Sequence, residues 1–425
     1  MNTNTENIPS ASPTLAAWIG LDWGDKEHAF SLVGEGSEQI QTGKVLQTAE
    51  TLHGWLNQLQ ARFQGRPVAL AIEAGGHPLL YVLAQYPWLE IYPVNPLTSS
   101  HFRTAFCVSG AKDDLPDSGV LLELVRFHRH KLSRWEPADE QTDLLDKLVR
   151  MRRDWVDRRT QCLNQLTNLL KSYYPQALEL IDLGTELALD FLSRWPDLLA
   201  LKLARAATVK KFFYQHNVRR SELVEKRLKL IRDAVALTTN SVVLHTSRLE
   251  LKLLVQLLKS FQAHIGQCEK EIAATFKEHE DAFLFRELPG AGPALAPRLL
   301  AGFGTDRSRY AGAENMQMFF GLAPVREKSG GQLYTHWRWR SPVFLRQTFI
   351  EWAGQTVIWS QWAAHYYDRM KAKGKKHHVI LRALAFKWIR VLWKCWQTRV
   401  PYSEATYLKA LEKRKSPNLP PPSGQ

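Results

Sequence analysis

Short apolar runs alternate with polar clusters rich in Gly and Pro in the first part of the chain, residues 14–135. Apolar runs at 17–21 and 29–33 flank a charged turn, which predicts a β-hairpin. Further apolar runs predict two more strands, and longer amphipathic patterns predict helices between and after them. The predicted strands are 67–72 and 89–94, and the predicted helices are 49–63, 78–86 and 118–130. This alternation predicts an α/β domain with a mixed sheet.

Residues 140–280 change to an almost wholly helical pattern. Adjacent apolar pairs recur every seven residues from Leu148 to Leu170, and a second series from Leu251 to Ile272 has alternating spacings of three and four. Such repeats keep one apolar seam facing a partner helix. Two interpretations fit: an antiparallel hairpin within one chain, or a coiled coil between chains that sets an oligomer. Shorter helical patterns fill residues 183–240.

A third, mainly helical unit is predicted over 283–412, and residues 1–13 and 413–425 are predicted as flexible tails. The third unit ends in a helix that mixes basic and aromatic residues. The predicted fold is therefore α/β plus all-α: a mixed sheet with helices, a helical coiled-coil middle and a mainly helical C-terminal domain.

Positive charge is concentrated in the rear of the chain. The chain has 56 Lys and Arg against 42 Asp and Glu, a net charge of +14. Residues 1–135 carry 10 basic and 13 acidic side chains, whereas 325–400 carry 15 basic and 3 acidic ones. This asymmetry predicts a polyanionic partner, most often a nucleic acid. For the basic and aromatic run at 371–394, the alternative is a partly buried helix with a solvated basic face.

The sequence does not support a membrane protein, a secreted protein or a zinc-binding protein. No apolar stretch reaches 18 residues, and the polar N-terminus lacks the order of a signal peptide. The four cysteines lie far apart without a CxxC pair, which indicates neither a zinc site nor a disulfide framework. We expect a cytoplasmic protein without membrane contact.

Four carboxylates occupy positions suited to a metal site. Asp22 and Glu73 each end a predicted buried strand, and Asp114 and Asp117 are spaced to share one face of the following helix. Carboxylate oxygens are the ligands that Mg²⁺ prefers, and two ions about 3.5–4 Å apart can hold both oxygens of a phosphoryl displacement. The alternatives are turn residues for single acids and helix caps for Asp114 and Asp117.

Two glycine-containing segments are candidate phosphate-binding sites. Ser329 precedes Gly330 and Gly331 and lies among basic residues, namely Arg326, Lys328, Arg338 and Arg340. Composition alone also fits a simple turn, and no neighbouring His and Asp complete a triad with Ser329. The second segment, LPGAGP at 288–293, resembles a helix-hairpin-helix turn in which Gly290 and Gly292 expose backbone N–H groups. A plain helix–helix turn is the alternative.

The order of these motifs resembles the DEDD-type transposases of the insertion sequence 110 family, which are related to the Piv and MooV DNA invertases. Asp22, Glu73 and the segment with Lys112, Asp114 and Asp117 are similar to the family's RuvC-like domain of RNase H fold. The segments LPGAG at 288–292, FFGLAP at 319–324 and SGG at 329–331 are similar to its C-terminal transposase domain. The resemblance spans about residues 16–400.

The resemblance implies a DNA transposase or recombinase of a prokaryotic, nucleoid-associated kind. It implies that Asp22, Glu73, Asp114 and Asp117 bind Mg²⁺, and that Ser329 becomes joined to a DNA 5′ phosphate. It implies nucleic-acid contacts at Lys112, Gly290, Gly292, Arg326, Lys328, Gly330, Arg338 and Arg340. The implied partners are donor and target DNA, a structured guide RNA, and further copies of the chain in a dimer or tetramer.

Three alternatives remain open from the sequence. A RuvC-like junction-resolving endonuclease would use the same acids with water as the nucleophile. A sugar or acetate kinase would share the sheet but needs a second similar domain, where residues 140–280 show helical heptads. A non-catalytic nucleic-acid-binding or scaffold protein would not depend on the acids.

Overall fold

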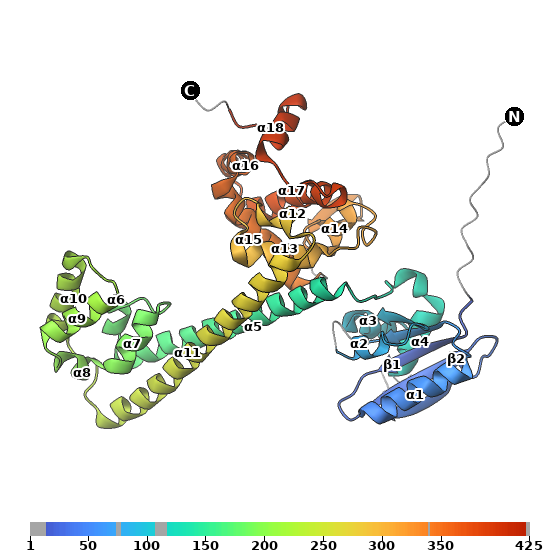
Figure 1. Ribbon diagram of the computed structural model, residues 1–425, viewed down its shortest axis with the longest axis horizontal. Coiled ribbons are helices and arrows are strands. Elements are labelled where there is room, and N and C mark those ends of the chain that lie inside the picture. Colours follow the sequence, from blue (N-terminus) through green and yellow to red (C-terminus); the bar gives the residue numbers. More distant parts are fainter. Residues whose placement is uncertain (1–13, 74–77, 107–116, 339–340, 422–425) are drawn as a thin grey trace. The chain divides into compact units, whose positions relative to one another are not determined.

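The computed structural model describes residues 14–73, 78–106, 117–338 and 341–421, and Figure 1 shows its helices and strands. The chain divides into two compact units, 1–137 and 138–425. The division falls where the sequence predicts the end of the α/β domain. The second predicted boundary, between 280 and 283, lies inside the second unit.

A five-stranded mixed sheet forms the centre of the first unit, in the order β3-β2-β1-β4-β5. β1 pairs antiparallel with β2 and parallel with β4, which pairs parallel with β5. The strands are β1 (Ala17–Asp22), β2 (Glu27–Gly34), β3 (Gln41–Leu46), β4 (Val68–Ile72) and β5 (Leu89–Pro93). The predicted hairpin and mixed sheet are thus confirmed. β3 was not predicted, because Val45 is its only buried residue and an edge strand with one apolar contact leaves no clear pattern.

Helices cover both faces of this sheet, so all five residues of β4 are buried. Leu52 and Leu56 of α1 pack on the face that carries Ile19, and α4 packs on the opposite face against Ala69 and Ala71. The helices of the unit are α1 (Ala49–Arg62), α2 (Leu79–Leu83), α3 (Pro96–Phe106), α4 (Asp117–Phe127) and the 3-10 helix η1 (Arg129–Lys131).

Gly20 lets α4 lie directly on β1. A Cβ at this position would collide with the backbone of α4 at Ser118 and Leu122. The Ser118 side chain also contacts Ser31 of β2, with 2.9 Å between the two hydroxyl oxygens. The start of α4 is therefore fixed against the sheet by close backbone contact and by a buried hydrogen bond.

Two long antiparallel helices begin the second unit: α5 (Glu140–Tyr173) and α11 (Ser241–Glu278) lie side by side in Figure 1. Arg152 bonds Glu269 at 2.6 Å, and further along the pair Trp155 packs against Phe261. The seven-residue series on α11 faces α5, since six of its seven members are buried. The seams thus meet within one chain, as the hairpin interpretation predicts, and association between chains stays a prediction.

Five short helices form a lobe at one end of the α5–α11 pair (Figure 1), with a core that includes Phe191, Trp195 and Phe213. Four of them lie within residues 183–240, where the sequence predicts short helices, and the first lies just before that stretch. These helices are α6 (Gln176–Leu180), α7 (Glu186–Arg194), α8 (Leu198–Lys202), α9 (Ala206–Gln215) and α10 (Ser221–Asp233).

The C-terminal lobe packs around four fully buried tryptophans, Trp352, Trp362, Trp388 and Trp396. Leu145 of α5 and Ile272 of α11 belong to the same core, which explains why the chain does not divide near residue 282. Its elements are α12 (Ala282–Arg286), α13 (Gly292–Phe303), α14 (Ala313–Phe319), β6 (Val325–Ser329), β7 (Gln332–His336), α15 (Val343–Trp359), α16 (Gln361–Ala372), α17 (His377–Thr398) and α18 (Glu404–Lys413).

The prediction of a flexible tail over 413–425 is wrong for residues 414–419. Arg369 donates hydrogen bonds to the Pro417 carbonyl and to the Asn418 side chain, both at 2.6 Å. Leu419 packs against the C-terminal core. The proline-rich composition suggested a loose end, but these contacts with α16 hold the segment. Residues 1–13 and 422–425 lie outside the described residues.

Candidate active site

Two of the predicted metal ligands lie side by side at one edge of the first unit's sheet. Asp22 ends β1, and Glu73 directly follows β4. The two strands are parallel neighbours, with Leu21 paired to Ile72. The carboxyl ends of parallel strands meet at the same sheet edge, so both carboxylates project there. The Ser99 hydroxyl donates a hydrogen bond of 2.8 Å to Glu73 and restrains its position.

Asp117 joins this edge through Arg103. Asp117 is the first residue of α4, the helix that packs on β1 and β4. Its carboxylate forms an ion pair with Arg103 of α3. Arg103 also lies near enough to Asp22 to affect its ionisation. We call Asp22, Glu73 and Asp117 the acidic edge.

The pKa of Asp22 is raised above its usual range. Burial is the largest cause, the negative charge of Glu73 raises the pKa further, and Arg103 opposes the rise. A bound cation would offset the cost of ionising Asp22 at this place. The chemistry of the donor set therefore fits a hard divalent ion.

The acidic edge is not arranged as a finished metal site. In the described ranges, no three or more His, Cys, Asp or Glu side chains already form a group that could hold a metal ion. Asp117 would have to exchange the Arg103 guanidinium for the ion. The predicted residues Lys112 and Asp114 lie outside the described residues.

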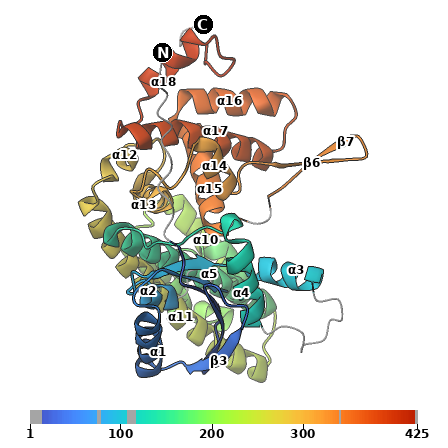
Figure 2. The same cartoon turned by 90° about the vertical axis from the view of Figure 1, so that its right-hand side faces the viewer.

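The predicted nucleophile ends the first strand of a two-stranded ribbon. β6 and β7 pair antiparallel, with Ser329 opposite Gln332. Gly330 and Gly331 form the turn, and their φ angles of 57° and 80° are those of a tight hairpin turn that favours glycine. The structure describes the backbone of Ser329 but not its side chain. We call β6, this turn and β7 the serine ribbon; Figure 2 shows it extending from the C-terminal lobe.

The register divides the serine ribbon into two faces. Residues paired across an antiparallel ladder share a face, so Ser329 shares one with Glu327, Gln332, Tyr334 and His336. On that face His336 bonds Glu327 at 2.9 Å. That contact raises the pKa of His336, and the Trp337 carbonyl contributes to the rise.

Basic residues occupy the other face and the base of the ribbon. Arg326 and Lys328 share the second face and are exposed. Arg338, just after β7, donates a hydrogen bond of 3.4 Å to the Ala323 carbonyl. Arg340 lies outside the described residues.

Gly290 and Gly292 lie at the start of α13, with φ angles of 69° and 55°. A Cβ on Gly290 would meet Gln355 and Trp359 of α15, so this glycine allows two segments to approach closely. Around Gly292 there is open space. Packing therefore accounts for Gly290, and a nucleic-acid contact at either glycine stays a prediction.

Sequence reasoning missed Ser99 and Arg103, because it assigned no element to residues 96–106. Asn95 accepts a hydrogen bond of 2.9 Å from the backbone N–H of Leu97, and Pro96 is the first residue of α3. Asn followed by Pro is a helix-start signal that could have revealed α3 and hence both side chains.

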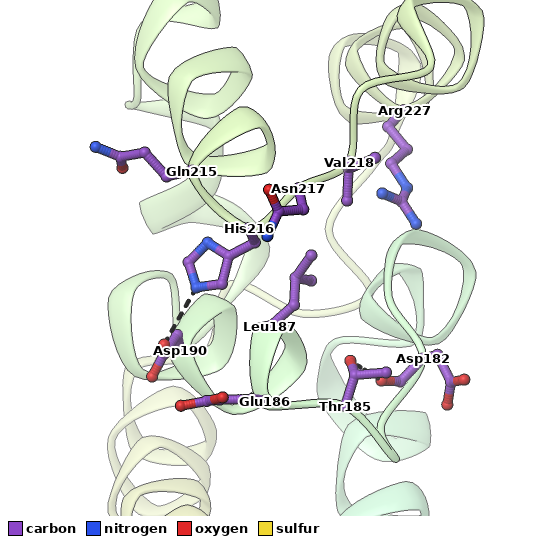
Figure 3. Close-up of a pocket in the computed structure, with 10 residues that line it drawn as sticks. All are labelled: Asp182, Thr185, Glu186, Leu187, Asp190, Gln215, His216, Asn217, Val218 and Arg227. Carbon is purple, nitrogen blue, oxygen red and sulfur yellow. Dashed lines mark hydrogen bonds and ion pairs between the residues drawn. The ribbon is translucent and has the colours of Figure 1, made fainter.

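A cavity of about 600 Å³ lies in the helical lobe and shares no residue with either candidate region (Figure 3). Asp190 at its wall bonds His216 at 3.2 Å and Lys259 at 2.8 Å. The hydrogen bond from Lys259 lowers the pKa of Asp190. These ion pairs join α7 to α9 and α11, which is a structural role. The lining residues are Asp182, Thr185, Glu186, Leu187, Asp190, Gln215, His216, Asn217, Val218 and Arg227.

Across the described part of the chain, no helix combines the length and the apolar character that a bilayer span needs.

Comparison with known proteins matches both candidate regions. Residues 19–175 match a family model described as "Transposase", and residues 282–368 match one described as "Transposase IS116/IS110/IS902 family". The first range contains the acidic edge, and the second contains the serine ribbon.

Three relatives that match over most of their length are named after insertion sequences. The chain is 27% identical to the mini-circle putative transposase for IS117 of Streptomyces coelicolor, over 92% of this chain and 96% of the relative. It is 25% identical to the insertion element IS900 uncharacterized 42 kDa protein of Mycobacterium paratuberculosis, over 92% and 98%. It is also 25% identical to the insertion element IS116 uncharacterized 44.8 kDa protein of Streptomyces clavuligerus, over 88% and 93%. The chain therefore belongs to the IS110 family of transposases.

Proposed function

We propose that this transposase cuts and rejoins DNA through a covalent 5′-phosphoserine at Ser329, with Asp22, Glu73, Asp114 and Asp117 as Mg²⁺ ligands. The observation that carries the proposal is the position of Asp22 beside Glu73 at the ends of parallel strands, with the Arg103–Asp117 ion pair close enough to Asp22 to affect its ionisation. An RNase H-like (RuvC-like) identity of the first unit is part of the proposal, supported by the mixed sheet with acids at one edge.

The reaction is an exchange of phosphoesters. The Ser329 hydroxyl oxygen attacks the scissile phosphorus, the bond to the 3′ oxygen breaks, and the serine proton balances the new 3′ hydroxyl. A 3′ hydroxyl from another strand then attacks the phosphoserine and releases the serine. Each step exchanges one ester for another, so rejoining needs no external energy source.

Each candidate region has a separate task in this exchange. Bound Mg²⁺ would polarise the scissile phosphate and stabilise its developing charge. Asp22 and Glu73 would hold that charge at a fixed sheet edge, while Ser99 orients Glu73. The glycine turn would let the DNA backbone approach Ser329, since neither Gly330 nor Gly331 has a side chain that blocks the tip.

The acids and the serine lie in different units, and we propose that they meet in an oligomer, as a dimer or tetramer in which acids of one subunit face the serine of another. We propose donor and target DNA as substrates, and a structured guide RNA as a further partner. The excess of positive charge in the second unit supports nucleic-acid partners.

Replacement of the serine tests the mechanism. The Ser329→Ala variant should lose the covalent protein–DNA adduct, detected as a shifted band in denaturing gels, and should lose strand transfer. Ser308→Ala, an exposed serine of the same unit, is the matched control. Strand transfer that persists in Ser329→Ala would refute the nucleophile assignment.

A RuvC-like structure-selective endonuclease is the second candidate, because the acidic edge is sufficient for hydrolysis by water. In that case Ser329→Ala would still cleave branched DNA and leave free 5′ phosphates, while Asp22→Asn would not. The two variants together therefore separate recombination from hydrolysis.

A further inference from the structure

Two arginines share one tryptophan at the base of the serine ribbon. Trp337 directly follows β7. The Arg382 guanidinium of α17 lies 4.3 Å from the Trp337 ring centroid, and that of Arg346 of α15 lies 5.4 Å away. Arg346 also donates to the Arg338 carbonyl at 3.2 Å and to the Ser341 hydroxyl at 3.0 Å. The end of β7, α15 and α17 thus place two cations against one ring.

These charges are not neutralised within the protein. Among the described residues, neither Arg346 nor Arg382 forms an ion pair with a carboxylate, whereas Arg390 on the same helix as Arg382 pairs with Glu314 at 3.3 Å. Both side chains are partly exposed. Two guanidiniums against one ring, neither paired with a carboxylate in the described part of the chain, concentrate positive charge that a phosphate anion would neutralise. Arg is also suited to bidentate phosphate contacts.

We propose that Arg346 and Arg382, held by Trp337, form a clamp for the DNA backbone near the scissile phosphate. We call these three residues the arginine clamp. Its occupant is the DNA strand attacked at the tip of the serine ribbon, because the ribbon joins the clamp directly to Ser329. The inference rests on the proposed function for the position of the scissile phosphate, while the anion site itself rests only on the clamp.

The length of the serine ribbon gives the distance between the arginine clamp and Ser329. The five residues of β7 separate Ser329 at the tip from Trp337 at the base. An extended strand of this length spans roughly 17 Å. Phosphates along one strand of B-DNA advance about 3.4 Å each along the helix axis. With the ribbon lying along that axis, the clamp contacts a phosphate about five nucleotides from the cleavage position.

DNA binding by the full chain tests the clamp. With a fluorescently labelled duplex, Arg382→Ala and Arg346→Ala should each weaken binding about tenfold at moderate salt. Each should also reduce the slope of log affinity against log salt by about 0.9, the value for one lost phosphate contact. Arg66→Ala is the matched control and should change neither quantity, since Arg66 pairs with Glu35 in the first unit and lies outside the basic run at 371–394.

Two further variants separate a folding defect from a binding defect. Arg382→Lys keeps the charge but cannot stack as a planar group, and should fall between wild type and Arg382→Ala. Trp337→Phe keeps an aromatic ring and should bind DNA nearly as wild type. Equal loss of binding in Arg382→Ala and Arg66→Ala, or an unchanged salt slope in Arg382→Ala, would overturn the clamp.

Replacing one DNA phosphate with a neutral group shows which phosphate the arginine clamp contacts. A methylphosphonate placed about five nucleotides from the cleavage position should weaken binding by a Ser329→Ala chain, and should have no further effect once Arg382→Ala is added. If the clamp variants lose affinity only for the element's RNA transcript, the DNA assignment is wrong. If the clamp maps as expected but Ser329→Ala still transfers strands, the nucleophile assignment fails and the clamp stands.

Discussion

The acidic edge and the serine ribbon are built in opposite ways. β1 and β4, which place Asp22 and Glu73, lie in the middle of a sheet covered by helices on both faces. In the ribbon, all five residues of β7 are exposed, and β6 and β7 pair only with each other. An isolated two-stranded ribbon is at best marginally stable in water.

The difference matches what each half of the proposed reaction requires. Metal ligands have to be held to within about 0.5 Å, which a buried sheet provides. A nucleophile that reaches DNA and acids on another subunit has to stand clear of its own core, which the ribbon provides. Substitutions at the acidic edge should therefore act mainly by removing a chemical group. Substitutions in the ribbon should act mainly by disturbing its conformation.

Asp22→Asn should have the largest effect. We expect DNA cleavage to fall at least about 1,000-fold, about 4 kcal/mol in activation free energy, because a charged ligand at the centre of the edge is lost. Burial and Glu73 raise the pKa of Asp22, so ionised Asp22 destabilises the fold above the unfolded-state pKa. The melting temperature of the variant at neutral pH should therefore not decrease.

Asp25→Asn is the matched control, since Asp25 is exposed in the turn after β1. Cleavage assays on branched and duplex DNA, together with calorimetry, measure both quantities. A cleavage-competent Asp22→Asn, or one that has simply unfolded, would contradict the role given to this carboxylate.

Gly20→Ala should have the next largest effect, on stability. The new methyl group would collide with the α4 backbone at Ser118 and Leu122, which cannot move without separating α4 from β1. Overpacking of this kind costs about 1–3 kcal/mol, and a backbone obstacle places it at the upper end. Gly54→Ala is the control and should raise the free energy of unfolding. Gly54 lies within α1 in open space, and Ala favours a helix more than Gly does. Denaturant titration measures both; an unchanged Gly20→Ala would show that α4 does not hold Asp117 in place.

Much of this fold could be predicted from hydrophobic periodicity. The central strands and the two long helices have strong patterns because they are buried on fixed faces. The edge strand β3 and helix α3 escaped prediction because few of their side chains reach a core. The join between α11 and the C-terminal lobe escaped because it depends on Leu145 and Ile272 contacting residues far along the chain.

The candidate site was predictable in its acids but not in its cations. Asp22 and Glu73 end apolar strands, and that position is legible in the sequence. The roles of the arginines depend on neighbours from other parts of the fold. Arg103 pairs with Asp117, and both Arg346 and Arg382 lie against Trp337. No local pattern distinguishes such an arginine from a solvated one.

Substitution in the ribbon turn should have a smaller effect and should leave both cores intact. Gly331→Val places a branched side chain at φ 80°, which costs about 1–2 kcal/mol. We expect strand transfer to fall about tenfold without a change in melting temperature. Gly36→Val is the control and should leave strand transfer unchanged, since Gly36 has a similar φ of 73° and open space around it but lies after β2 in the first unit. A fall in melting temperature equal to that of Gly20→Ala would show that the ribbon is part of the folded core.

The smallest effect should be the pH response of the ribbon, and it separates two histidines in opposite environments. The hydrogen bond to Glu327 raises the pKa of exposed His336, whereas burial lowers the pKa of His279, which bonds Thr142 at 2.8 Å. The stability that the His336–Glu327 contact adds to the ribbon is therefore fully present below about pH 6.5. It is lost as pH rises through the raised pKa of His336. His279 behaves oppositely, because protonation as pH falls through about 6.5 destabilises the core. NMR titration of both imidazoles measures the contrast, and Glu327→Gln should lower the pKa of His336 while leaving that of His279 unchanged. If Glu327→Gln left the pKa of His336 unchanged, this would mean that the contact between His336 and Glu327 does not form.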